Sequence, residues 1–97
     1  MGAGQLQEAL SDFTKSISLN ETYSLAYNNR GATYARMTQY DKALADFSKA
    51  IEIDPANKVA YRNRALAYKK LGELRKAEAD MEVMVKLERE TKDNGTE

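Results

Sequence analysis

Residues 27–55, YNNRGATYARMTQYDKALADFSKAIEIDP, decide the fold of this 97-residue chain. The same spacing of residues recurs 34 positions later. For example, Tyr27 and Arg30 correspond to Tyr61 and Arg64. Residues 24–57 and 58–91 are identical at nine of 34 aligned positions, which are scattered through the window. A fixed period of this size predicts stacked helical units, each of which buries its apolar face against the next.

Five helices are predicted from apolar residues that recur at intervals of three and four. Gly31 lies inside the second of them, where glycine costs up to ~1 kcal/mol relative to alanine, so a close helix approach is expected there. Asp41 is expected to cap the third helix, Pro55 to end it, and Asn57 to cap the fourth. The predicted helices span residues 5–19, 24–37, 42–54, 58–71 and about 74–90.

The order of aromatic, small and proline positions resembles the tetratricopeptide repeat. In the clearest unit the matching residues are Tyr27, Arg30, Gly31, Tyr34, Ala43, Phe47 and Pro55. In the next they are Tyr61, Arg64, Ala65, Tyr68, Ala77 and Met81, after which Arg89 replaces the proline. Ala9 and Phe13 match the second helix of an earlier copy, and Gly4 falls at the position of Gly72, the turn between helices.

This resemblance implies an all-α, superhelical stack of antiparallel helix pairs, a TPR-like α-solenoid of about five helices. A half repeat is expected at 4–23, followed by full repeats at 24–57 and 58–91, which together form a domain over 4–91. Residues 1–3 are expected to be a flexible N-terminus and residues 92–97 a disordered tail.

The composition argues against catalysis and against bound cofactors. The chain has no cysteine and no histidine, so it lacks a thiol nucleophile, the commonest general base and the commonest metal ligands. We therefore expect no enzyme activity, no cofactor and no metal site. No apolar run approaches the ~20 residues of a membrane span, and the N-terminus lacks a signal segment, which predicts a cytoplasmic or nuclear protein without membrane contact.

Charge is segregated along the chain although its formal net charge is zero. Segments 24–38 and 58–72 contain seven basic residues and no acidic one, whereas all 15 acidic residues lie elsewhere. These segments contain the first helix of each full repeat, and in the family the first helices line the concave groove. The resemblance therefore implies a basic groove that attracts an acidic or C-terminal peptide. The expected ligand-binding residues are Leu25, Asn28, Asn29, Ala32, Arg36, Val59, Arg62, Asn63, Leu66, Lys69 and Lys70.

Three other functions stay open. Family members that bind the C-terminal carboxylate of heat-shock proteins 70 and 90 have an asparagine at the position of Asn29 or Asn63. The match fails at the other binding positions. If 24–57 is aligned with the second repeat of those proteins, Val59 and Asn63 stand where lysine and arginine are needed. If 58–91 is aligned with it, Asn28 and Ala32 stand where lysine and asparagine are needed. The chain could also be a structural segment of a longer helical-repeat scaffold. An RNA-binding helical repeat is the third alternative. The chain has only two repeats that include a first helix, which is few for reading bases, so we expect no nucleic-acid partner.

Both ends of the predicted stack lack a neighbouring helix. At the N-terminal end we expect the face formed by Leu6, Leu10, Phe13 and Ile17 to be partly uncovered. At the C-terminal end apolar residues wrap more than one side of the last helix, namely Met81, Val83, Met84, Val85 and Leu87. These faces predict either a homodimer formed through the terminal helices or a parent protein that covers them itself.

Overall fold

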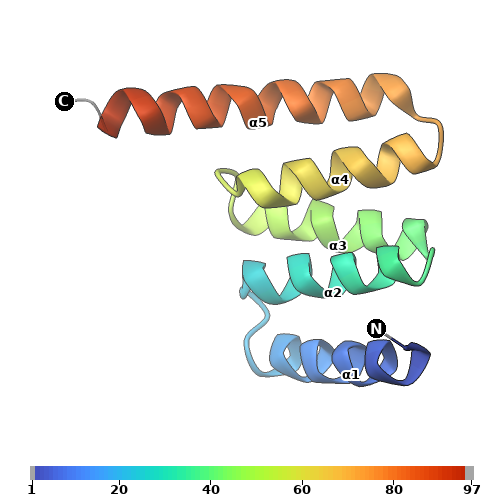
Figure 1. The fold of residues 1–97 in the computed structure, drawn as a ribbon. Coiled ribbons are helices and arrows are strands. Elements are labelled where there is room, and N and C mark those ends of the chain that lie inside the picture. Colours follow the sequence, from blue (N-terminus) through green and yellow to red (C-terminus); the bar gives the residue numbers. More distant parts are fainter. Residues whose placement is uncertain (1, 96–97) are drawn as a thin grey trace.

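Five α-helices form the fold of residues 2–95, the part of the chain that the computed structural model describes, and no strand occurs in that part. The helices are α1 (Ala3–Leu19), α2 (Ser24–Arg36), α3 (Tyr40–Ile53), α4 (Lys58–Lys70) and α5 (Leu74–Gly95). Each packs against its neighbours in the chain, and α2 also contacts α4. Consecutive helices run antiparallel and stack in chain order (Figure 1). The predicted all-α stack is confirmed.

Three predicted boundaries differ from those of the structure. Gly4 lies inside α1, so its predicted turn position is wrong. Asp41 lies in the first turn of α3 and does not cap it, because the helix begins one residue earlier, at Tyr40. Helix α5 continues to Gly95, past the expected end near residue 90, although Lys92 is the only strong helix former among residues 91–95. Residues 1 and 96–97, parts of the predicted flexible ends, lie outside the described residues.

The connection between α3 and α4 follows the sequence prediction. Helix α3 ends at Ile53, two residues before Pro55. Asn57 caps α4, because its side-chain oxygen accepts a hydrogen bond from the backbone N–H of Ala60 at 3.1 Å. The cap satisfies one of the backbone donors that the first turn of a helix leaves without a partner.

The turn inside each helix pair places one residue in the left-handed region. In the α2–α3 turn this residue is Thr38, with φ 59°, and in the α4–α5 turn it is Gly72, with φ 79°. The left-handed conformation costs an L-residue about 1–2 kcal/mol, whereas glycine adopts it freely. We therefore expect Thr38→Gly to raise the free energy of unfolding by about 1 kcal/mol in urea titrations. The reverse change, Gly72→Thr, should lower it; a loss of stability in Thr38→Gly would contradict this account.

The centre of the core lies where α2, α3 and α4 meet. Ala43, Phe47 and Ala67 form its buried cluster, and Phe47 is 1% exposed. A Cβ added to Gly31 would lie 2.7 Å from Phe47 Cε1 and 3.1 Å from Asp46 Cβ. The close helix approach predicted at Gly31 is confirmed, because any side chain there would push α3 away from α2.

The two ends of the stack differ in how they are covered. Leu6 and Ile17 are buried at 9% exposure, on a helix whose only neighbour is α2. Leu10 and Phe13 of the same face are half-buried, so the face that was expected to be partly uncovered is closed at its two ends and partly open between them. At the other end Met81, Val83 and Val85 are 36–40% exposed, as predicted.

Candidate functional site

Helices α2 and α4 lie side by side and are joined by a pair of asparagines. The side-chain amide of Asn63 donates a hydrogen bond to the side-chain oxygen of Asn28 at 3.2 Å. Asn28 is 4% exposed, so it is buried between the helices. It is therefore not accessible to a peptide, in contrast to the sequence prediction, because α4 covers it and Asn63 occupies its acceptor.

An open hollow of about 320 Å³ lies between α2, α3 and α4, and we call it the α2–α4 hollow. Apolar groups from all three helices form part of its lining, whereas Arg36 and Lys70 bring positive charge. These two residues hold equivalent repeat positions in the last turns of α2 and α4, and both are exposed. The lining residues are Ala32, Ala35, Arg36, Tyr40, Phe47, Asn63, Leu66, Ala67 and Lys70.

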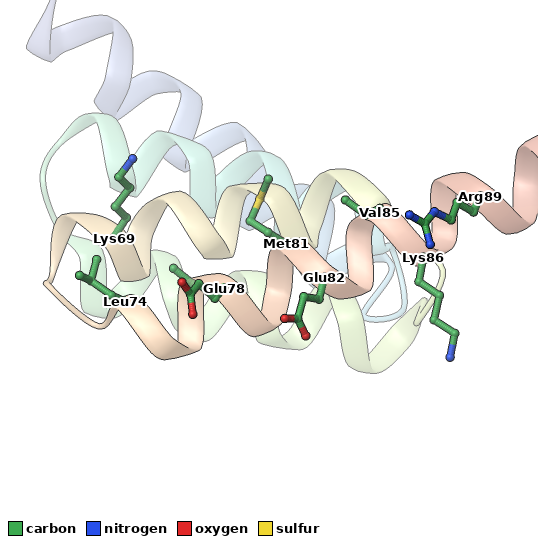
Figure 2. Close-up of a pocket in the computed structure, with 9 residues that line it drawn as sticks. Lys69, Leu74, Glu78, Met81, Glu82, Val85, Lys86 and Arg89 are labelled. Atoms are coloured by element: carbon green, nitrogen blue, oxygen red, sulfur yellow. The ribbon is translucent and has the colours of Figure 1, made fainter.

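Five of the eleven predicted ligand-binding residues therefore line one hollow, and the other six lie outside it. Leu25 and Val59, at the beginnings of α2 and α4, are 52% and 46% exposed. Arg62 is exposed on α4, whereas Asn29 is half-buried on α2. Lys69 borders a different surface, along α5 (Figure 2). The hollow brings together Ala32, Arg36, Asn63, Leu66 and Lys70.

Two arginines of the basic segments are engaged inside the stack. Arg30 donates two hydrogen bonds to the carboxylate of Asp46, at 2.8 and 2.7 Å, and its third nitrogen reaches the Thr14 hydroxyl at 3.4 Å. Arg64 repeats the arrangement with Asp80, at 2.8 and 2.7 Å. Its third nitrogen donates to the Ser48 hydroxyl at 3.2 Å. Each guanidinium thus joins the helix that follows it to the helix that precedes it.

These guanidinium groups are permanently charged and are compensated locally. The hydrogen bond to the aspartate raises the pKa of Arg30 and of Arg64, although burial opposes the shift. Both guanidinium groups therefore carry their charge at neutral pH. Tyrosine rings flank each guanidinium, with Arg64 5.7 Å from the centre of the Tyr61 ring. The other five basic residues of these segments are Arg36, Lys58, Arg62, Lys69 and Lys70.

Comparisons with known proteins agree with this geometry. One tetratricopeptide-repeat family model matches residues 24–57, and a second matches residues 47–79. The Arabidopsis OM64 TPR domain is 31% identical to the chain, with 90% of this chain and 72% of that one covered, and a TM-score of 0.85. The chain belongs to the tetratricopeptide-repeat (TPR) family.

Two further TPR structures that resemble the chain are complexes. The second TPR of Spaghetti (RPAP3), bound to the HSP90 peptide SRMEEVD, is 28% identical, covers 87% of this chain and 78% of its own, and has a TM-score of 0.83. The TPR2B domain of yeast Sti1, in a complex with pHsp70, is 27% identical over 93% of this chain and 72% of its own, with a TM-score of 0.88. No curated protein sequence matches the chain.

The TPR pattern alone did not identify the residues that α3 contributes to the hollow. Tyr40 and Phe47 line it from α3, and neither is among the predicted ligand-binding residues. The signal that could have found Tyr40 is its place directly after the left-handed turn, which brings it next to the end of α2. Within residues 2–95, no cluster of three acidic side chains is arranged to hold a metal ion. None of the described helices is long and apolar enough to cross a membrane.

Proposed function

We propose that this TPR chain is a non-catalytic protein-interaction module that binds an acidic peptide segment across α2 and α4. The observation that carries the proposal is the α2–α4 hollow, in which alanine and leucine side chains lie beside Arg36 and Lys70. Leu66 is 54% exposed and offers apolar contact for an uncharged peptide side chain. Cationic groups beside it select carboxylates, because charge-assisted hydrogen bonds are the strong ones.

The ligands of similar TPR domains support this chemistry. The RPAP3 domains were solved with the HSP90 peptide SRMEEVD and with the HSP70 peptide SGPTIEEVD, both of which end in Glu-Glu-Val-Asp. Each such peptide carries three acidic side chains and a terminal carboxylate. The cations of α2 and α4 match a ligand of this kind in sign.

Recognition of acidic side chains is favoured here over recognition of the terminal carboxylate. A carboxylate clamp needs polar donors that face the groove, whereas Asn28 is buried and bonded to Asn63. Val59 stands at a position where the clamp would need a cation. We therefore infer that the side-chain charge of the peptide, and not its free end, supplies most of the attraction.

Fluorescence anisotropy with labelled SRMEEVD tests the proposal. We expect a dissociation constant in the micromolar range or weaker, since the groove is short. The variant Arg36→Glu/Lys70→Glu should abolish binding because it reverses both positive charges that line the α2–α4 hollow. Lys15→Glu/Arg75→Glu, which changes the net charge equally at exposed sites on α1 and α5, should leave binding nearly intact.

Two altered peptides separate the modes of recognition. Replacing the three acidic side chains by amides should remove binding, whereas amidating only the C-terminus should weaken it less than about 10-fold. Loss of binding on C-terminal amidation alone would indicate a carboxylate clamp. Equal binding of both chain variants, or no binding of SRMEEVD at millimolar concentration, would contradict the proposed groove.

A further inference from the structure

Helix α5 presents an open surface that no other helix of the described chain covers, with an open volume of about 1010 Å³ above it. An apolar strip runs along this surface at helical spacing, and Leu74, Met81 and Val85 within it are 59%, 39% and 40% exposed. We call this surface the α5 face. It consists of Leu74, Ala77, Glu78, Met81, Glu82, Val85, Lys86 and Arg89, with Lys69 of α4 at its edge (Figure 2).

The charges on the α5 face are ordered along the helix. Glu78 and Glu82 lie in its first half, and Lys86 and Arg89 follow (Figure 2). None of the four takes part in an ion pair with another side chain of the described chain. Like charges one turn apart on a helix repel, so each half of the face favours a partner of the opposite charge.

The equivalent surface of α3 shows that this order of charges is not needed for internal stacking. Helix α4 covers that surface, with Ala60 and Ala67 buried against its neighbours. At the positions of Glu78, Glu82 and Lys86, one repeat earlier, α3 has Leu44, Ser48 and Glu52, and the position of Arg89 corresponds to Pro55, just after the end of α3. The α5 face therefore differs in its charges from the α3 surface that receives α4.

We propose that two copies of the chain associate through their α5 faces, with the helices antiparallel about a two-fold axis near residues 83–84. In this arrangement Glu82 lies opposite Lys86 of the second copy, and Glu78 lies opposite Arg89. Met81 lies opposite Val85 in nearly the same register, because the midpoints of the three pairings, at positions 84, 83.5 and 83, differ by no more than one residue. The two-fold axis makes each contact twice, so the face is complementary to itself.

The size of the face sets the strength of the association. The 22 residues of α5 form a helix about 33 Å long. A single helix pair buries less surface than the roughly 1,200–2,000 Å² of a stable standard interface. The dimer is therefore reversible, with a dissociation constant in the micromolar range. The α2–α4 hollow has no residue in common with the α5 face, so the inference does not rest on peptide binding.

Sedimentation equilibrium of two charge-reversed variants tests this arrangement. Glu78→Lys/Glu82→Lys and Lys86→Glu/Arg89→Glu should each raise the dissociation constant by about 10-fold or more, since like charges then face each other. An equimolar mixture of the two should form a heterodimer at least as tight as the native dimer. The exposed positions keep helix-forming residues, and circular dichroism checks that both variants fold.

A matched control separates local pairing from net charge. Glu8→Lys/Asp41→Lys raises the net charge by four, as Glu78→Lys/Glu82→Lys does, but on α1 and α3, away from the α5 face. This control should retain most of the dimerisation. The inference is overturned if the native chain is monomeric at several hundred micromolar, or if the mixed variants fail to associate. Binding of a synthetic peptide of residues 57–72 to a monomeric native chain would also overturn it, because the face would then accept an α4-type helix.

Discussion

Replacing Phe47 with alanine is expected to lower the free energy of unfolding by about 3–5 kcal/mol. The ring is 1% exposed and packs with Ala43 and Ala67. Gly31 has no side chain that could move into the space, and the two alanines have only a methyl group each, so the cavity stays open. The loss is a large part of the 5–15 kcal/mol that stabilises a typical domain. Urea unfolding followed by circular dichroism measures it.

Phe47→Met is the matched control for this prediction. Methionine occupies the same repeat position in the next unit, at Met81, and it fills irregular space with little strain. We expect it to cost less than about 1.5 kcal/mol. If Phe47→Ala lost no more stability than Phe47→Met, the convergence of α2, α3 and α4 on this ring would not be the centre of the core.

Asp80→Ala is expected to destabilise the chain by about 2–3 kcal/mol. The carboxylate is 5% exposed and accepts both hydrogen bonds of the Arg64 fork. Its removal leaves a guanidinium between tyrosine rings without its counter-charge. The expected loss lies below the 3–5 kcal/mol of a fully buried pair, because the Arg64 side chain is 20% exposed and water screens part of its charge.

The chain offers an internal control at the same repeat position. Asp12 lies 34 residues before Asp46 and 68 before Asp80, but it is exposed. Asp12→Ala should therefore change stability by less than about 0.5 kcal/mol, as is usual for a surface site. Thermal and urea unfolding of both variants provide the comparison. Equal losses in the two would mean that the aspartate acts through its own helix and not through the arginine.

The parts of the fold that repeat could be predicted, because repetition reveals which positions must make the same contact. The close helix approach at Gly31, where the next copy has the small residue Ala65, followed in this way. The coverage of the N-terminal helix did not follow. Apolar spacing at Leu6 and Ile17 indicates that a face is buried, but it does not indicate which neighbouring helix buries it.

The sequence predicts which two helices form most of the candidate site, but it predicts only some of the side chains that line it. The repeat pattern placed Arg36 and Lys70 in equivalent positions, and both line the hollow. Asn28 was expected to be accessible because its repeat position faces the concave groove in the family. The sequence alone does not reveal that the side-chain amide of Asn63, on α4, donates a hydrogen bond to the side-chain oxygen of Asn28, on α2. Tyr40 and Phe47 entered the hollow from α3, a helix that the family pattern assigns to the opposite side.

The arginine forks also bear on how the stack unfolds. Arg30 ties α3 to α1, and Arg64 ties α5 to α3, so two side chains connect all the odd-numbered helices. In repeat proteins, cooperativity depends on the coupling between adjacent units. A terminal helix that frays must break one of these charged links before the next unit loosens. The consequence is an all-or-none transition across the five helices, in place of stepwise melting from either end.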